Sequence, residues 1–129
     1  MKNTTSLFLI ILTTVITSCV QETHLKTIIF KVDFSKVQTI DNPSVKGQFT
    51  SPSWEKAIPL TDENNDNIYE AKVEFEAAQY GVQFKFENNG EYELEGRDNR
   101  FIKLKYMPEI IHYETVFDNP EGQQKQITN

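Results

Sequence analysis

Hydrophobic and polar residues alternate with a period of two along three stretches of this chain. In the first stretch the apolar positions are Ile28, Phe30, Val32 and Phe34, and the same alternation recurs over 69–76 and 82–87. Successive side chains of a β-strand point to opposite faces, so each stretch predicts a strand with one buried and one exposed face. Shorter runs at 101–106 and 110–117 are rich in aromatic and β-branched residues and predict further strands.

Clusters of turn-forming residues separate these runs. The clusters are Asp41-Asn42-Pro43, Ser51-Pro52-Ser53, 62–67, Asn88-Asn89-Gly90 and 96–99. Gly and Asn tolerate a positive φ, and Asp or Asn side chains bond to their own backbone, so such residues reverse the chain. Short strands with regular turn signals and no sustained helical period predict an all-β fold. We expect an antiparallel, immunoglobulin-like β-sandwich of about seven to eight strands.

The beginning of the chain has the pattern of a secretory signal. Lys2 precedes the apolar run Leu7–Leu12, which is too short to span a bilayer. The residues Ile16-Thr17-Ser18-Cys19 resemble a bacterial lipobox, in which cleavage precedes a cysteine that receives a lipid. We therefore expect a signal peptide over 1–18, lipidation of Cys19 and a tether over 19–26. The alternative is an ordinary signal peptide, with Cys19 removed or idle.

Composition limits what the rest of the chain can do. Residues 27–117 fit one domain, and the polar residues 118–129 predict a flexible tail. The net charge is −6 and basic residues do not cluster, which argues against nucleic-acid binding. Cys19 is the only cysteine, so a disulfide within the chain is excluded. The expected location is the cell envelope of a bacterium, as a secreted lipoprotein held on the membrane by Cys19.

The motifs expected of an enzyme or a metal site are absent from the sequence. There is no Gly-x-Ser-x-Gly elbow, and His24 and His112 lack the spacing of metal ligands. The acidic stretch 62–67 lacks the glycine and the bidentate glutamate of a calcium loop, since Val73 stands at the twelfth position. Carboxylates are plentiful enough for a glycosidase pair, but one small sandwich leaves little room for a catalytic cleft. We expect no catalysis, no metal and no cofactor.

Three residues are candidates for a ligand-binding surface. Lys85 lies between Phe84 and Phe86, so strand alternation turns it away from the core if the two phenylalanines face inward. Trp54 follows the 51–53 loop, and Tyr92 follows a hairpin-type turn. Each also has an ordinary explanation, because tryptophans commonly lie in cores, tyrosines pack across strands, and strand lysines are commonly only solvated.

In order along the chain, these residues resemble a known family. The segments are Val45-Lys46-Gly47-Gln48-Phe49 with Trp54, Phe84-Lys85-Phe86 with Gly90-Glu91-Tyr92, and Asp98-Asn99-Arg100. They are similar to motifs of the starch- and glycogen-binding modules, carbohydrate-binding module families 20 and 48, and the resemblance covers about 27–117.

The resemblance implies a site. Trp54 and Tyr92 would form a stacking platform for an α-1,4-glucan, and Lys85 and Asn99 would bond to glucose hydroxyls. Glu93 is a weaker candidate. Tyr92 stands where the family usually has tryptophan, which gives a smaller stacking face.

Two hypotheses of different classes follow. The first is a lipid-anchored domain that binds an α-glucan, such as starch, glycogen or a maltooligosaccharide, without chemistry. The second is a structural or protein-interaction sandwich of the cell envelope that has lost sugar binding. They differ in whether Trp54, Lys85 and Tyr92 are exposed on one face of the domain.

Overall fold

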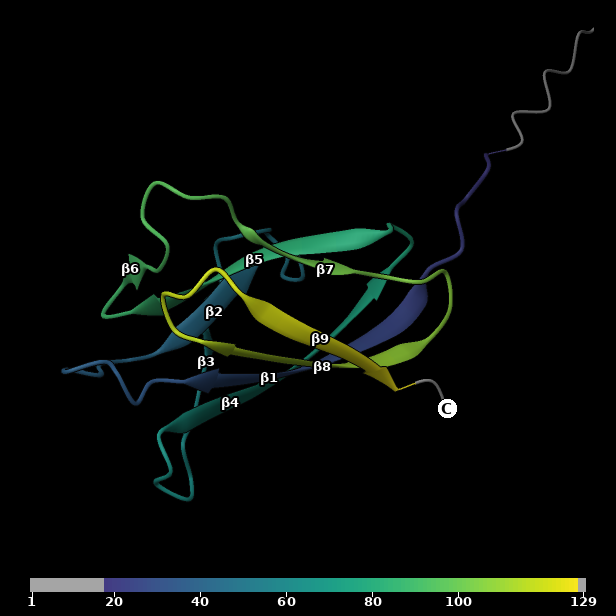
Figure 1. Cartoon of the computed structure of the whole chain (residues 1–129). Coiled ribbons are helices and arrows are strands. Elements are labelled where there is room, and N and C mark those ends of the chain that lie inside the picture. Colours follow the sequence, from purple (N-terminus) through teal and green to yellow (C-terminus); the bar gives the residue numbers. More distant parts are fainter. Residues whose placement is uncertain (1–17, 128–129) are drawn as a thin grey trace, which may run out of the picture.

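Two β-sheets lie against each other across a shared hydrophobic core (Figure 1). This is a computed structural model, and it describes residues 18–127. The strands in that range are β1 (His24–Asp33), β2 (Ser44–Gly47), β3 (Ile58–Pro59), β4 (Ile68–Ala77), β5 (Gly81–Asn88), β6 (Glu91–Tyr92), β7 (Arg100–Lys103), β8 (Glu109–Val116) and β9 (Gly122–Ile127). The first sheet has the order β4-β1-β8-β9, and the second has the order β3-β2-β5-β6 with β7 also paired to β5.

The predicted all-β sandwich is confirmed. The described range holds nine strands, compared with the seven to eight that were expected. The short strands β2, β3 and β6 and the polar strand β9 are not apparent from the sequence pattern. The three alternating stretches became β1, β4 and β5. One pairing departs from a purely antiparallel arrangement: β1 pairs antiparallel with β4 but parallel with β8, with Lys26 opposite Glu109. A period of two predicts which face a residue takes, but it does not specify the neighbouring strand.

Both ends of the domain are more ordered than the sequence suggested. β1 begins at His24, inside the expected tether, and Lys26 is buried with an ion pair to Glu109 at 3.2 Å. At the other end, β9 occupies part of the expected flexible tail and pairs with β8. The Gln124 side chain bonds to the backbone of Lys103, which ties this polar strand to β7. Of the expected signal peptide, residues 1–17 lie outside the described residues.

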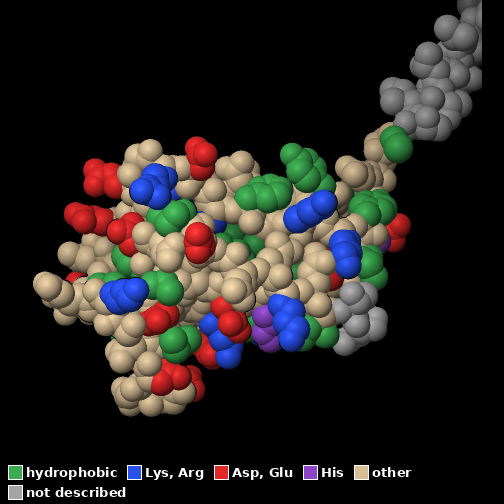
Figure 2. All heavy atoms as spheres, viewed as in Figure 1, with side chains coloured by type: hydrophobic (Ala, Val, Ile, Leu, Met, Phe, Trp, Pro, Cys, Tyr) green, Lys and Arg blue, Asp and Glu red, His purple; other side chains and the backbone are tan. Residues whose placement is uncertain are grey.

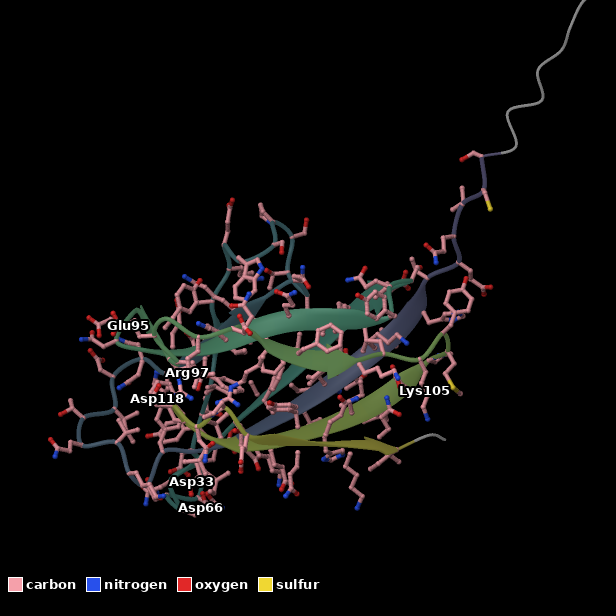
Figure 3. All side chains as sticks on the ribbon, turned by 45° about the horizontal axis from the view of Figure 1, so that its top comes forward. Asp33, Asp66, Glu95, Arg97, Lys105 and Asp118 are labelled. Atoms are coloured by element: carbon pink, nitrogen blue, oxygen red, sulfur yellow. The ribbon has the colours of Figure 1, made fainter. Side chains whose placement is uncertain are left out.

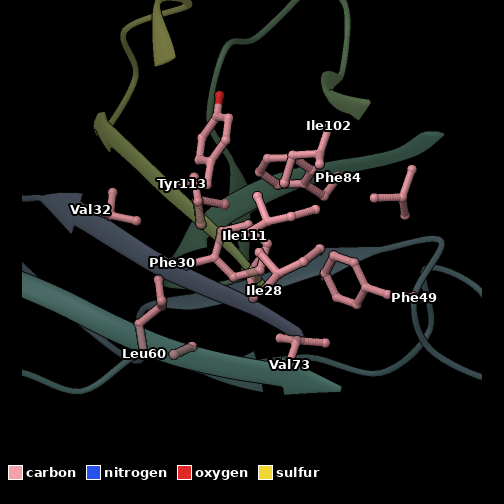
Figure 4. Packing of buried hydrophobic residues seen from close by; sticks show 14 of the residues in the cluster. Ile28, Phe30, Val32, Phe49, Leu60, Val73, Phe84, Ile102, Ile111 and Tyr113 are labelled. Carbon is pink, nitrogen blue, oxygen red and sulfur yellow. The ribbon is translucent and has the colours of Figure 1, made fainter. Parts of the chain in front are cut away.

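Phe30 lies at the centre of the core (Figure 4). Its ring lies 5.0 Å from that of Phe84, 5.5 Å from that of Phe86 and 6.1 Å from that of Tyr113. These rings come from both sheets, so aromatic packing joins the layers. The apolar members of each alternating stretch therefore all turn inward, and their polar neighbours form the outer faces.

The predicted turn at Asn88-Asn89-Gly90 is a tight hairpin between β5 and β6. Asn89 and Gly90 both have positive φ, at 54° and 73°, which is the backbone signature of a type I′ turn. The hairpin pairs Glu87 with Tyr92. Directly paired residues share one face of a sheet, so this turn decides on which side Tyr92 emerges.

Candidate functional site

The candidate site lies on the outer face, by which we mean the side of the β2-β5-β6-β7 sheet that faces away from the core. Val45, Phe84 and Phe86 are fully buried in the core, so alternation turns their strand neighbours to the outer face. The residues brought there are Ser44, Lys46, Gln83, Lys85, Glu87 and Tyr92. Strands β2 and β5 pair directly, which places Lys46 opposite Lys85.

Trp54 reaches this face from the loop after β2. Its backbone N–H donates to the Gly47 carbonyl at 2.9 Å, which folds the loop back on the strand end. Thr50 Oγ1 also donates to the carbonyls of Gly47 and Pro52. The backbone of Trp54 has a φ of 68°, in the left-handed region that bulky residues seldom adopt. The loop therefore holds the indole in place at a cost in backbone strain.

Trp54 and Tyr92 meet on the outer face. Their ring centroids lie 6.2 Å apart with an interplanar angle of 80°. Tyr92 is 45% exposed and Trp54 is half-buried, so both rings are in contact with solvent. The sequence separates these residues by several strands and turns, and the fold brings them together as an aromatic pair at the surface.

A charged cluster supports the Tyr92 ring. Lys46 Nζ lies 5.7 Å from the ring centroid, within range of a cation–π interaction, and forms an ion pair with Glu87 Oε1 at 3.1 Å. Ser44 Oγ donates to the other carboxylate oxygen of Glu87 at 3.0 Å. The hydrogen bond to Glu87 raises the pKa of Lys46, so its ammonium stays charged beside the ring. Sequence reasoning missed Lys46 and Glu87 as neighbours of Tyr92.

Lys85 lies on the predicted face but is not free. Its side chain is only 9% exposed, so the expectation of an exposed lysine is wrong. Its ammonium donates to the carbonyls of Leu94 at 3.1 Å and Arg97 at 3.0 Å. The segment after β6 folds over this part of the sheet, helped by a positive φ at Leu94, and covers the lysine. Nothing in the local strand pattern shows that another segment covers the outer face.

Glu93 is placed on the core side and not at the surface. It is 2% exposed and forms an ion pair with Arg100, at 2.6 Å from Oε1 to Nε and 2.8 Å from Oε2 to Nη2. Its oxygens also accept the backbone N–H groups of Phe86 and Asp118. Each carboxylate oxygen thus already has two partners. Glu93 follows Tyr92 directly, and strand alternation turns it the opposite way.

Asn99 is exposed but belongs to a different part of the outer face. Its Nδ2 donates to Gln83 Oε1 at 2.9 Å. Both residues line a surface hollow of about 460 Å³ together with Arg97, Asp98 and Phe101. The structure therefore brings Trp54 and Tyr92 together but sets Asn99 beside a different aromatic residue. In the sequence, Phe101 and Lys103 alternate with Ile102 and Leu104, a signal that could have placed Phe101 outward.

The remaining candidate residues lie away from this face. Cys19 is exposed in the segment before β1 and has a free thiol. Asp62 accepts backbone N–H groups of Asp66 and Asn67 within its own loop, as in a solvated turn. Between residues 18 and 127, no group of three His, Cys, Asp or Glu side chains is arranged to hold a metal ion. No helix in this part of the chain is long and apolar enough to cross a membrane.

The fold and this surface define a class, a small two-sheet β-sandwich domain with an aromatic pair on one outer sheet face. No protein-family model matches the chain, and no curated protein matches it. Among solved structures it is similar to CBM25-1 of the beta/alpha-amylase from Paenibacillus polymyxa. That likeness has 13% identity and a TM-score of 0.47, and covers 83% of this chain and 95% of that chain. At this level of similarity, function has to be inferred from the chain's own residues.

Proposed function

We propose that this domain binds carbohydrate at the Trp54–Tyr92 pair without catalysing a reaction. The observation that carries the proposal is that two residues far apart in sequence meet with their rings exposed on one face. Sugars have apolar C–H faces that stack on aromatic rings and hydroxyls that need polar partners. Lys46, beside Tyr92, supplies a charged donor at this place.

The proposed ligand is an α-glucan, such as starch, glycogen or a maltooligosaccharide. The two rings stand at 80° to each other, so they form a corner and not a flat platform. An α-1,4-linked glucan curves along its length and can present successive units to two inclined rings. A β-1,4-linked chain is straighter and suits coplanar rings. The motif resemblance at Trp54 and Tyr92 favours the same ligand, whereas the Lys85 ammonium is bonded to backbone carbonyls and adds no support.

The affinity should be modest. The aromatic pair lies on an open surface and binds a flexible, well-solvated ligand, so ordering and desolvation offset much of the stacking energy. We expect dissociation constants that are roughly micromolar to millimolar.

Lys85 does not contact the ligand in this proposal, because its ammonium already donates to backbone carbonyls. Its role is to hold the 94–97 segment in place on the sheet.

Tryptophan fluorescence tests this proposal directly, because Trp54 is the only tryptophan. Titration with maltoheptaose or β-cyclodextrin should give a saturable change, and cellohexaose should give none. Calorimetry should show that Trp54→Gly abolishes binding. Glycine suits this position because it accepts the positive φ without strain, so the variant should stay folded.

A matched control is Tyr106→Ala, which removes another exposed tyrosine outside the aromatic pair and should bind like the wild type. If the folded wild-type domain shows no response to any of these sugars up to millimolar concentration, the carbohydrate proposal is wrong. The protein-interaction module of the cell envelope then becomes the better hypothesis.

We further propose that lipid on Cys19 holds the domain at a bacterial membrane. Cys19 is exposed in a segment without strand structure just before β1, which leaves its thiol accessible. The preceding apolar run and the lipobox-like residues support this proposal. Mass spectrometry of the protein expressed in a bacterium should find the lipid on Cys19. Cys19→Ala should release the protein from the membrane fraction, and persistence there would contradict the proposal.

A further inference from the structure

A second aromatic pair lies on the outer face, at the other end of β5. Tyr80 and Phe101 are 77% and 46% exposed, and their ring centroids lie 6.0 Å apart at an angle of 50°. In the space-filling view, hydrophobic side chains with a neighbouring basic residue lie above β5, away from the acidic end of the molecule (Figure 2). Two exposed rings in contact need an explanation, because neither is buried in the core.

The fold holds this second pair firmly. A Cβ added at Gly81 would come within 2.0 Å of the Phe101 ring, so the ring lies directly on the Gly81 backbone. The Tyr80 carbonyl accepts the Leu104 backbone N–H at 2.6 Å, which ties the start of β5 to the end of β7. Phe101 therefore lies on a paired strand, and Tyr80 lies in the turn before β5, where its backbone hydrogen bond to Leu104 holds it.

Polar groups adjoin the Phe101 ring. The hollow of about 460 Å³ is lined by Gln83, Arg97, Asp98 and Asn99 beside Phe101. An apolar ring next to amide and charged groups has the composition that a sugar unit requires, since one face stacks while hydroxyls are bonded. Asn99 and Gln83 already bond to each other, which fixes both amides at the hollow.

Strand register relates the two aromatic pairs. Tyr92 is paired with Glu87, and Phe101 is paired with Gln83, on the same edge of β5. Gln83 and Glu87 are four residues apart on one strand, which at about 3.3 Å per residue corresponds to roughly 13 Å. Both rings emerge on the outer face. Lys85 lies between these two places beneath the 94–97 segment, so an extended ligand that contacts both has to pass over or beside that segment, and a monosaccharide cannot reach both.

We propose that Tyr80, Phe101, Gln83 and Asn99 form a second sugar subsite, and that the ligand is an extended glucan chain that occupies both aromatic pairs. This proposal rests on the function proposed above. The Trp54–Tyr92 pair anchors the chain, and the second subsite binds units several positions further along it. Affinity therefore rises with chain length until both subsites are filled.

A chain-length series tests the second subsite. Calorimetry should show that the wild type binds maltoheptaose more tightly than maltotriose. Tyr80→Ala and Phe101→Ala should each weaken maltoheptaose binding by up to about tenfold and leave maltotriose binding unchanged. Asn99→Ala should act in the same direction with a smaller effect. Trp54→Gly should remove binding of both sugars, and Tyr106→Ala should change neither.

The outcomes separate the two proposals. If the wild type binds no glucan, the proposed function and the second subsite both fail. If the wild type binds but neither Tyr80→Ala nor Phe101→Ala changes the preference for the longer sugar, only the second subsite is wrong. Tyr80 is mostly exposed, so Tyr80→Ala keeps the test valid should Phe101→Ala fail to fold.

Discussion

At the scale of single residues, this domain buries several charged side chains. Arg100 is 4% exposed and donates to Glu93, to Thr115 Oγ1 at 3.0 Å and to the Asn119 carbonyl at 2.6 Å. Burial acts to lower the pKa of Arg100, but its hydrogen bonds to Glu93 and the charge of that group outweigh burial and raise the pKa above its ordinary value. The guanidinium stays charged, and its positive charge compensates the buried negative charge of Glu93.

Removal of Arg100 should therefore be costly. Arg100→Ala leaves the buried Glu93 carboxylate without its cation, and we expect a loss of about 3–5 kcal/mol in the free energy of unfolding. Urea denaturation measures this. The exposed ion pair between Lys72 and Glu74 offers a control, since Lys72→Ala should cost at most about 1 kcal/mol. Equal effects of the two substitutions would show that the buried pair does not hold the domain together.

At the scale of elements, close packing between strands explains Gly47. It ends β2 opposite Phe84 of β5, and an added Cβ would come within 2.6 Å of the Gln83 carbonyl and 2.7 Å of Phe84 Cβ. Backbone and core atoms have little room to move there. The same residue accepts the N–H of Trp54, so the close approach of β2 to β5 also places the loop that carries the indole.

Gly47→Ala should destabilise the domain by about 1–3 kcal/mol through overpacking. Thermal denaturation gives the measurement. Gly90 provides the matched control, because nothing lies within 4 Å of its added Cβ and its φ of 73° is one that asparagine tolerates. Gly90→Asn should cost much less. A Gly47→Ala variant as stable as the wild type would mean that β2 shifts without loss of packing.

At the scale of the whole molecule, two buried ion pairs close the sandwich at opposite ends. Arg100 of the second sheet reaches Thr115 of the first sheet, near Asp118. At the far end, Lys26 of the first sheet bonds to Glu109 and to the carbonyls of Lys105 and Met107 in the connection between the sheets. Figure 3 shows Asp118 and Lys105 at the two ends. The aromatic core lies between them.

This arrangement predicts an uneven stability across the sheets. β1 pairs with β4 on one side and β8 on the other, whereas β9 is an exposed edge strand paired only with β8. Hydrogen exchange followed by NMR should find the slowest amides in β1, around Ile28 and Phe30, and much faster exchange in β9. Protection of β9 equal to that of β1 would show that the C-terminal strand unfolds only with the whole domain.

The structure brings together two of the five candidate binding residues that the sequence predicted. Trp54 and Tyr92 both follow turns in the sequence, and the structure places them in contact. Asn99 was expected near them, but it lies beside Phe101. Lys85 is buried because the 93–99 segment folds back on the sheet and covers it. Glu93 is buried because its carboxylate forms an ion pair with Arg100. Their surroundings depend on contacts between distant segments, which no local pattern records.

The sequence by itself determined the strands and turns whose cause is local. Alternation over two residues defined β1, β4 and β5, and Asn89-Gly90 defined the hairpin that turns Tyr92 outward, because both depend only on neighbouring residues. Only the tertiary structure decided the parallel pairing of β1 with β8, the addition of the polar strand β9 and the two aromatic pairs on one face. These features depend on which segments meet in space. The free energy that favours this strand arrangement comes from contacts throughout the core and from the buried charges.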